Sequence, residues 1–232
     1  MSAPNNEKWQ ELHDKSTTIE VRINPNLAIK KILESKNLIQ KDSSNLTVLE
    51  IGSGFGRNLL YLAEHNFADE YFGIDITETA IDKAKNILSN HANIHLKLEN
   101  AGEKLEFPDE SIDCIFDIMS AITFISDEHE RTKYFSEVSR TLKAGGIYFF
   151  LAPRKEGRFH DIYDNESLFS QGFIKRKIDG MLERVYTEKD LITFLSNLTK
   201  VELQVESEHT RAFGDEKFIR ENGFWFGAFR KD

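Results

Sequence analysis

A short apolar stretch followed by a glycine-rich turn constrains the fold of this chain more than any other feature. The stretch VLEI, residues 48–51, is typical of a buried β-strand, and GSGFG, residues 52–56, follows it directly. The next residues, RNLLYLAEHN, have the spacing of an amphipathic helix. Glycine lets a backbone turn sharply and approach a ligand closely. The unit therefore predicts a ligand site where the strand ends.

The same alternation of short strands and longer helical segments continues along the chain. Further strands are predicted at residues 70–76, 93–98, 112–118 and 147–152. Helices are predicted at residues 24–39, 77–90 and 128–142, and the KAGG sequence, residues 143–146, is expected to form a helix C-cap and turn. Such βαβ units give a parallel sheet with helices on both faces.

The chain changes character after Pro153. Residues 154–186 are charged and aromatic without a clean period, which predicts an insertion over one end of the sheet. Thr187 is the expected N-cap of a helix in TEKDLITFLSN. Two strands at 200–206 and 223–230 follow without a helix between them, so we expect them to be antiparallel.

No break in composition divides the 232 residues, so we expect a single domain. It divides into an N-terminal helical or lid segment (1–40), a ligand-binding core (46–153), the substrate-side insertion (154–186), and a C-terminal helix and strand pair (187–232). The formal charge of −9 disfavours a large phosphate-backbone footprint, so no DNA partner is expected. A polar N-terminal segment, a single cysteine and the lack of a long apolar run predict a cytoplasmic protein without a membrane segment.

Two ligands compete for the glycine turn, a dinucleotide and S-adenosylmethionine. A dinucleotide turn has the spacing G-x-G-x-x-G, whereas here Gly52, Gly54 and Gly56 alternate and Arg57 takes the place of the last glycine. Glu50 lies at the end of the strand, and its carboxylate repels a pyrophosphate but stabilises an ammonium and a sulfonium. The residues favour S-adenosylmethionine.

The second strand ends in a carboxylate as well. Asp75 is suited to accept hydrogen bonds from both hydroxyls of a ribose, and Ile76 beside it can pack on a purine face. The ends of two strands thus supply groups for the two halves of one adenosyl ligand.

These motifs resemble those of the class I S-adenosylmethionine-dependent methyltransferases. VLEIGSGFGRN is similar to the first motif of that family, GIDIT to the second, EKLEFPDESIDCIFDI to the third and fourth, and YFSEVSRTLKAGGIYFFLAP to the helix and strand that follow. The resemblance covers roughly residues 46–153. It implies a Rossmann-like α/β fold in three layers, with a seven-stranded, mostly parallel sheet whose last strand is antiparallel.

The resemblance also implies which residues hold the donor. Glu50 and the glycine turn line its methionyl and ribose side, Asp75 holds the ribose, and Asp117 lies nearest the methyl group. Either Asn100 or Ala101 meets the adenine edge, depending on one inserted residue. The full set implied is Glu50, Gly52, Ser53, Gly54, Gly56, Asn58, Asp75, Ile76, Asn100, Ala101, Gly102 and Asp117.

Methyl transfer from a sulfonium is an in-line displacement, which requires an aligned acceptor, exclusion of water and, for a protonated acceptor, a base. Asp117 is the first candidate for a catalytic base; the alternative is that it binds the donor ammonium or caps the next turn. His13, His160 and His209 are weaker candidates for the same role. Trp9 with His13 is either part of a lid or an ordinary helix contact.

The acceptor is less constrained by the sequence. The basic run IKRKI, residues 174–178, either attracts an acidic substrate or forms a solvated face. A group of aromatic residues either walls an acceptor pocket or builds the small core of the insertion. These residues are Phe159, Tyr163, Phe169, Phe173 and Tyr186.

Several chemistries are disfavoured. Enzymes that methylate the exocyclic amines of nucleobases have a Pro-Pro motif after the fourth strand, and this chain has DIMSA there. Cys114 lies inside an apolar strand, where a thiol is usually inert, which disfavours methylation of cytosine C5. Asp113 and Asp117 are roughly 13 Å apart on one strand, too far for one ion to bridge, so no metal is expected.

The sequence therefore predicts an enzyme that moves a methyl group from S-adenosylmethionine to an oxygen, nitrogen or sulfur atom of a small molecule, with S-adenosylhomocysteine as product. We expect a monomer or homodimer. Methylation of a protein or RNA group, and a non-catalytic module that binds S-adenosylmethionine, are the alternatives.

Overall fold

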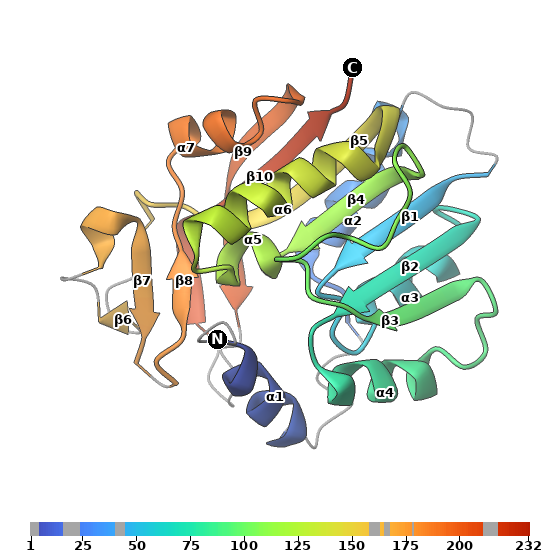
Figure 1. The fold of residues 1–232 in the computed structure, drawn as a ribbon, viewed down its shortest axis with the longest axis horizontal. Helices are drawn as coiled ribbons and strands as arrows, with labels where there is room; N and C mark the ends of the chain where they lie inside the picture. Colours follow the sequence, from blue (N-terminus) through green and yellow to red (C-terminus); the bar gives the residue numbers. More distant parts are fainter. Residues whose placement is uncertain are drawn as a thin grey trace.

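A seven-stranded sheet in the order β3-β2-β1-β4-β5-β10-β9 forms the centre of this computed structural model (Figure 1). The structure describes residues 5–15, 24–39, 45–157, 163–164, 168–177, 179–210 and 218–232. The strands are β1 (Thr47–Ile51), β2 (Glu70–Asp75), β3 (Ile94–Leu98), β4 (Ile112–Ile118), β5 (Leu142–Pro153), β9 (Thr199–Thr210) and β10 (Phe218–Arg230).

The pairing of the strands confirms the predicted fold class. Strands β1 to β5 pair with one another in parallel, and β10 is antiparallel to both β5 and β9. The last strand of the sequence thus lies inside the sheet, between β5 and β9, and is the one that runs against the rest.

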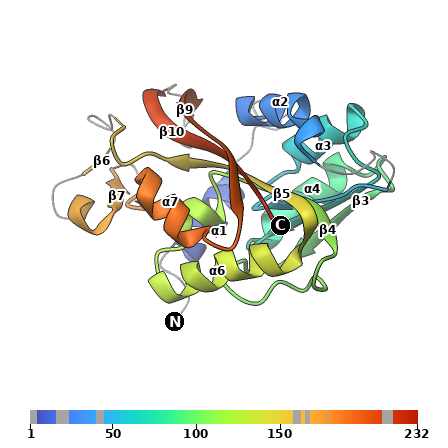
Figure 2. The same ribbon diagram turned by 90° about the horizontal axis from the view of Figure 1, so that it is seen from above.

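Helices cover both faces of the sheet, which gives three layers (Figure 2). Alternate residues of β5 enter different cores: Tyr148 and Phe150 pack on one face, and Phe149 and Leu151 on the other. The first face packs against α6 (Glu128–Thr141) and α7 (Glu188–Phe194), and the second against α2 (Leu27–Glu34) and α3 (Arg57–Glu64); α4 (Glu78–Ile87) contacts β2 and β3.

The N-terminal segment contains a helix that the apolar periodicity did not reveal. Helix α1 (Asn6–Lys15) carries few apolar side chains and is held mainly by polar contacts with distant parts of the chain. It lies beside α4 at the edge of the sheet toward which β1 and β2 point (Figure 1).

The KAGG sequence differs from the prediction. It is not a separate turn after a helix cap, because β5 begins at Leu142, directly after α6, and runs through these residues. Leu142 pairs with Ile112 and Ile147 pairs with Cys114, so β5 bulges between these two pairs. The bulge is stabilised by Gly145, whose positive φ of 78° suits glycine and whose N–H donates to Lys231 O at 2.8 Å.

The predicted insertion is a small three-stranded sheet, with β6 (Tyr163–Asp164), β7 (Phe173–Arg176) and β8 (Leu182–Arg184). Short 3₁₀ segments lie at Lys36–Leu38 and Phe169–Gln171, and a short helix, α5 (Ala121–Phe124), follows β4. Thr187 caps α7 as predicted, accepting from Asp190 N at 3.1 Å in a capping box. In the described part of the chain, no helix is long and apolar enough to cross a bilayer.

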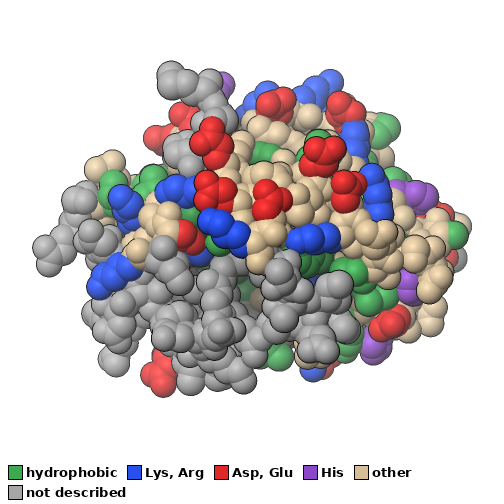
Figure 3. Space-filling model, turned by 90° about the horizontal axis from the view of Figure 1, so that it is seen from below, with side chains coloured by type: hydrophobic (Ala, Val, Ile, Leu, Met, Phe, Trp, Pro, Cys, Tyr) green, Lys and Arg blue, Asp and Glu red, His purple; other side chains and the backbone are tan. Residues whose placement is uncertain are grey.

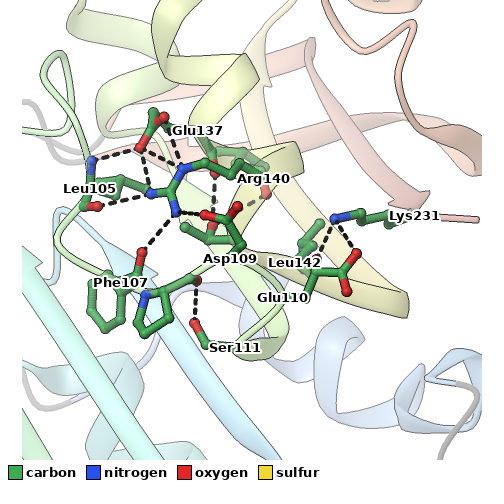
Figure 4. A network of polar contacts seen from close by, with 12 residues as sticks. Leu105, Phe107, Asp109, Glu110, Ser111, Glu137, Arg140, Leu142 and Lys231 are labelled. Carbon is green, nitrogen blue, oxygen red and sulfur yellow. Dashed lines mark hydrogen bonds and ion pairs between the residues drawn. The ribbon is translucent and has the colours of Figure 1, made fainter.

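Arg140 on α6 fixes the long loop between β3 and β4 (Figure 4). Its guanidinium donates to the backbone oxygens of Leu105 and Phe107, both at 2.9 Å, and to the carboxylates of Glu137 and Asp109, both at 2.6 Å. One side chain therefore ties the loop that carries residues 100–102 to the helix layer.

Candidate functional site

Three acidic side chains end three adjacent strands of the parallel sheet. Glu50 lies near the end of β1, Asp75 ends β2, and Asp117 lies near the end of β4, paired with Ile51. Carboxyl ends of parallel strands meet at one edge of a sheet. The residues predicted from three separate motifs are therefore brought together at one crevice, and all three are buried.

The glycine turn closes the end of β1 against the neighbouring strands. The N–H groups of Gly52 and Ser53 both donate to Ile74 O, at 2.8 and 2.9 Å. A Cβ on Gly52 would lie 1.5 Å from Ser120 Oγ, so only glycine lets the loop after β4 come this close. Gly54 has a φ of 54° and open space where its Cβ would be. That open space is where a ligand can approach the backbone.

Glu50 is 1% exposed, and only one of its oxygens is hydrogen-bonded. Oε1 accepts from Asn58 Nδ2 at 2.6 Å, whereas Oε2 is buried and has no hydrogen-bond partner in the structure. Burial raises the pKa of Glu50 to about 8, and the nearby carboxylates of Asp75 and Asp117 act in the same direction. A cation in the crevice would relieve both effects.

Asn58, on the first turn of α3, joins the crevice to the N-terminal segment. It is 6% exposed, and its Oδ1 accepts from Asn26 N at 3.0 Å while its amide donates to Glu50. Ser53 Oγ, in the glycine turn, is buried without a hydrogen-bond partner in the structure, like Glu50 Oε2.

Asp75 is held by its neighbours on both oxygens. Oδ2 accepts from Gly54 N at 2.9 Å, and Oδ1 accepts from Thr77 N at 3.0 Å and from Thr77 Oγ1 at 2.9 Å. The side chain is 7% exposed, and Ile76 next to it is half-buried. The carboxylate is thus fixed against the glycine turn.

Asp117 lies deeper than the other two, with no exposed surface. Its Oδ1 accepts from Ser120 N at 2.8 Å, and its Oδ2 accepts from Ile122 N at 2.6 Å and from Tyr134 Oη at 2.7 Å. Burial raises the pKa of Asp117 to about 7 against the effect of these donors. This is the geometry of a residue that caps the start of α5, one of the roles that the sequence left open.

The backbone around this cap is strained. Met119, between Asp117 and Ser120, has a φ of 59°, a value that residues with a side chain seldom adopt. Strain of this kind persists only where surrounding contacts fix it, and it is often found at functional sites. Neither this strain nor the partner Tyr134 on α6 was evident from the sequence.

The segment expected at an adenine edge lies beside the end of β3. Glu99 N donates to Asp75 O at 2.9 Å, which places the segment next to Asp75, the predicted ribose ligand. Asn100 Oδ1 accepts from Gly102 N at 3.0 Å, so this oxygen already forms one hydrogen bond within the loop. Ala101 is 9% exposed. Both residues lie in the loop that directly follows β3.

Helix α1, with Asn5 directly before it, connects the segment after β2 with α5 and the insertion. At one end, His13 Nδ1 lies 2.6 Å from Thr77 Oγ1, and Gln10 Nε2 donates to Thr79 Oγ1 at 2.7 Å. At the other end, Asn5 Nδ2 donates to both Phe124 O and Leu182 O, at 2.9 and 3.1 Å. The sequence singled out His13 but missed Asn5 and Thr77, whose partners are far apart along the chain.

The rings of α1 face the same mouth. Trp9 packs edge-to-face on Phe124 with ring centres 4.8 Å apart, and His13 lies 5.4 Å from the ring of Phe55 in the glycine turn. Phe55 lies in the glycine turn after β1, and Phe124 ends α5, the helix that follows β4. Trp9 and His13 therefore contact the segments that follow these two strands.

Other predicted candidates are accounted for by packing. Asp113 accepts from Thr47 N and from Lys143 Nζ, and burial raises the pKa of the Cys114 thiol. Phe173 lies under the guanidinium groups of Arg131 and Arg184, at 5.2 and 5.4 Å.

The insertion splits the predicted basic run and uses Tyr186 as a link. Arg176 is buried and paired with Asp179, whereas Lys175 and Lys177 are exposed. Tyr186 Oη donates to Ile122 O at 2.5 Å, which fastens the insertion to α5. Phe159 and His160 lie outside the described residues, as do the side chains of Tyr163 and His209.

The described part of the chain offers no metal-binding group, and the face seen from below carries no continuous basic patch (Figure 3). No group of three His, Cys, Asp or Glu side chains in the described part of the chain could hold a metal ion. Seen from below, the described Lys and Arg side chains are interspersed with Asp and Glu (Figure 3). This mixed pattern gives no support for binding to a nucleic-acid backbone.

Solved structures share this fold over the whole chain. A protein from work on the conversion of a disulfide bond into a thioacetal group during echinomycin biosynthesis has a TM-score of 0.70 at 18% identity, covering 98% of this chain and 93% of that one. The N-methyltransferase NodS from Bradyrhizobium japonicum WM9, in complex with S-adenosyl-L-homocysteine, has a TM-score of 0.65 at 16% identity, covering 98% of both chains.

An S-adenosylmethionine-dependent methyltransferase from Mesorhizobium loti has a TM-score of 0.63 at 17% identity and covers 88% of this chain and 98% of its own. At these identities the likeness shows the fold. A comparison with curated protein sequences gave no significant match.

The family comparison adds the evidence from sequence. Residues 48–146 match the family model described as a methyltransferase domain. The matched range contains the glycine turn and the three carboxylates that meet at the crevice. We conclude that residues 48–146 form a methyltransferase domain, within a chain whose fold is shared with S-adenosylmethionine-dependent methyltransferases of known structure.

Proposed function

We propose that this methyltransferase acts on an oxygen, nitrogen or sulfur atom of a small molecule. The observation that carries the proposal is the position of α1, which joins Thr77 at the donor side to Leu182 in the insertion. A mouth bridged in this way admits a small acceptor more readily than a folded protein or an RNA helix. The similar structures whose descriptions mention echinomycin biosynthesis and N-methylation are consistent with this proposal.

We further propose that the predicted residues hold the donor. Glu50 Oε2 and Ser53 Oγ are buried without partners, and leaving such atoms unpaired costs about 1–3 kcal/mol each. The α-ammonium and carboxylate of the methionyl part supply the missing charge and hydrogen bonds. Asp75 would receive a ribose hydroxyl, and Ile76 with residues 100–102 would border the adenine. We therefore retain as donor contacts the residues that the sequence implied, apart from Asp117, which has no exposed surface.

Asp117 is proposed to position the site rather than to move a proton. All three of its hydrogen bonds come from protein donors, and it has no exposed surface. S-adenosylmethionine supplies, when bound, a methyl group already activated on a sulfonium. The protein then has to orient the acceptor and exclude water, and Asp117 does this indirectly by holding Ser120 and α5 against the glycine turn.

Binding of S-adenosylhomocysteine, measured by isothermal titration calorimetry, tests the donor half. Asp75→Ala is expected to weaken binding by about tenfold or more, because it removes a charged hydrogen-bond partner. Glu183→Gln in β8 is the matched control, since it also changes a buried carboxyl but lies outside the donor set. Equal affinity of Asp75→Ala and the unmodified protein would contradict the assignment.

A methyl-labelled donor tests the acceptor half. The protein is incubated with fractionated cell extract, and label in the low-molecular-weight fraction is the expected result. Label recovered with precipitated protein or RNA would instead indicate that the acceptor is a macromolecule. Tight donor binding without any transfer would instead indicate a non-catalytic module.

A further inference from the structure

Helix α1 reaches Asp75, the proposed ribose ligand, through a chain of hydrogen bonds. Covering the site would not require such a specific contact. His13 is 5% exposed and its Nδ1 lies 2.6 Å from Thr77 Oγ1, which in turn lies 2.9 Å from Asp75 Oδ1. The ring of His13 packs beside Trp9 and Phe55, with ring centres 5.6 and 5.4 Å apart. Water has little access to a hydrogen bond in such apolar surroundings, and the low local dielectric strengthens the bond.

The protons along this chain have one consistent arrangement. An ionised carboxylate has no proton to give, so Thr77 Oγ1 donates its single proton to Asp75 Oδ1. The hydroxyl oxygen then acts as acceptor toward His13, whose Nδ1 must carry a hydrogen. His13 therefore orients the Thr77 hydroxyl, and the hydroxyl orients the carboxylate.

The count of acceptor sites shows what this arrangement does for Asp75. Oδ1 already accepts two hydrogen bonds, both from Thr77, whereas Oδ2 accepts one, from Gly54 N. Each carboxylate oxygen has about two acceptor sites. The remaining site is on Oδ2, the oxygen that accepts from Gly54 N, and Gly54 itself has open space at its Cβ position. The contacts from α1 thus leave one acceptor site of Asp75 unused, next to the glycine turn.

We propose that His13 is a positioning residue, which acts through Thr77 to hold Asp75 in the orientation that receives a ribose hydroxyl of the donor. The proposal rests on the proposed function, in which Asp75 is the ribose ligand. Because His13 belongs to α1, docking of α1 and binding of the ribose then favour each other. The helix that covers the mouth also prepares the donor site.

Two ligands and matched variants test this role. The ligands are S-adenosylhomocysteine and its 2′,3′-dideoxy analogue, and affinities are measured by calorimetry. His13→Phe keeps a ring beside Trp9 and Phe55 but removes the Nδ1 donor, and His13→Asn restores a donor near the same place. Gln10→Ala is the control, because it removes another α1–α4 hydrogen bond, of 2.7 Å to Thr79, without contacting Thr77.

We expect His13→Phe to weaken binding of S-adenosylhomocysteine about fivefold, the equivalent of one hydrogen bond. The dideoxy analogue is expected to bind His13→Phe and the unmodified protein within about twofold, since it lacks the hydroxyl that Asp75 receives. His13→Asn is expected to recover most of the loss. The loss in the double variant His13→Phe/Thr77→Val should be smaller than the sum of the two single losses, because both act on one chain of contacts.

Three outcomes would overturn the inference. An equal loss for both ligands, or an equal loss in Gln10→Ala and His13→Phe, would mean that His13 only helps α1 to dock. Unchanged binding of S-adenosylhomocysteine in His13→Phe would leave the residue without any role at the ribose. Absence of binding to the unmodified protein would instead contradict the proposed function itself, so the two failures are distinguishable.

Discussion

Replacement of Glu50 by Gln is expected to abolish a pH dependence of donor binding. The free protein holds this carboxyl with a pKa of about 8, because the side chain is buried and Oε2 has no hydrogen-bond partner. At pH 7 the neutral form then exceeds the ionised form by about tenfold, and ionisation costs about 1.4 kcal/mol. A ligand ammonium favours the ionised form and lowers the pKa on binding.

The direction and size of the pH dependence follow from the coupling between ligand binding and ionisation of Glu50. Below the pKa of about 8, binding must ionise Glu50, so affinity for S-adenosylhomocysteine is expected to rise about tenfold per pH unit between roughly pH 6 and 7. The increase flattens as the pH approaches 8. Near pH 7, binding should release about 0.9 proton, which titrations in two buffers of different ionisation enthalpy measure directly.

The variants separate Glu50 from other titrating groups. Glu50→Gln keeps an acceptor for the Asn58 amide, so weaker but pH-independent binding is expected. Glu183→Gln, whose carboxyl is also buried and has a pKa raised to about 7, should keep the full slope. A slope that persists in Glu50→Gln, or affinity of the unmodified protein that is flat from pH 6 to 8, would refute the reasoning.

Three further outcomes concern stability. Between about pH 5 and 8 the unmodified protein should lose about 1.4 kcal/mol of unfolding free energy per pH unit relative to Glu50→Gln. The reason is that the Glu50 carboxyl is protonated in the folded protein and loses its proton on unfolding, whereas Gln does not titrate. Denaturation of both proteins at several pH values measures the difference. Asp117→Asn should lower Tm by about 5 °C, because three donors would then share one acceptor oxygen in place of two. The kcat of the folded variant should stay within about threefold, and a 100-fold loss would instead identify Asp117 as a base. Arg140→Ala should lower Tm by a similar amount, about 5 °C in calorimetry, and unchanged stability would show that its four loop and helix contacts are dispensable.

The parallel part of the fold followed from periodicity because each element buries its own apolar side. Helix α1 did not, since its stabilising contacts are polar and distant: Asn5 reaches Phe124 and Leu182, more than one hundred residues away. Local pattern carries no information on such partners. The KAGG residues were misassigned for the same reason, because the bulge in β5 depends on Lys231 at the other end of the chain.

The candidate site was predictable where a single residue at the end of a strand indicates its function by its side chain and its position. Glu50 and Asp75 were found because a carboxylate after a strand and beside a glycine turn has few other uses. The role of Asp117 was not decided by its position, because its partner Tyr134 comes from a helix that follows later in the sequence. Thr77 gave no signal either, since a hydroxyl after a strand is also an ordinary helix cap.

The place of β10 in the sheet has a consequence for biosynthesis. Its aromatic residues Phe224, Phe226 and Phe229 are buried, and they complete the cores on both faces beside β5. About 65 residues separate the end of β5 from the start of β10, so β5 is synthesised well before the strand that pairs with it. A nascent chain that lacks β10 therefore leaves one edge of β5 unpaired, and an unpaired strand edge favours association with other chains.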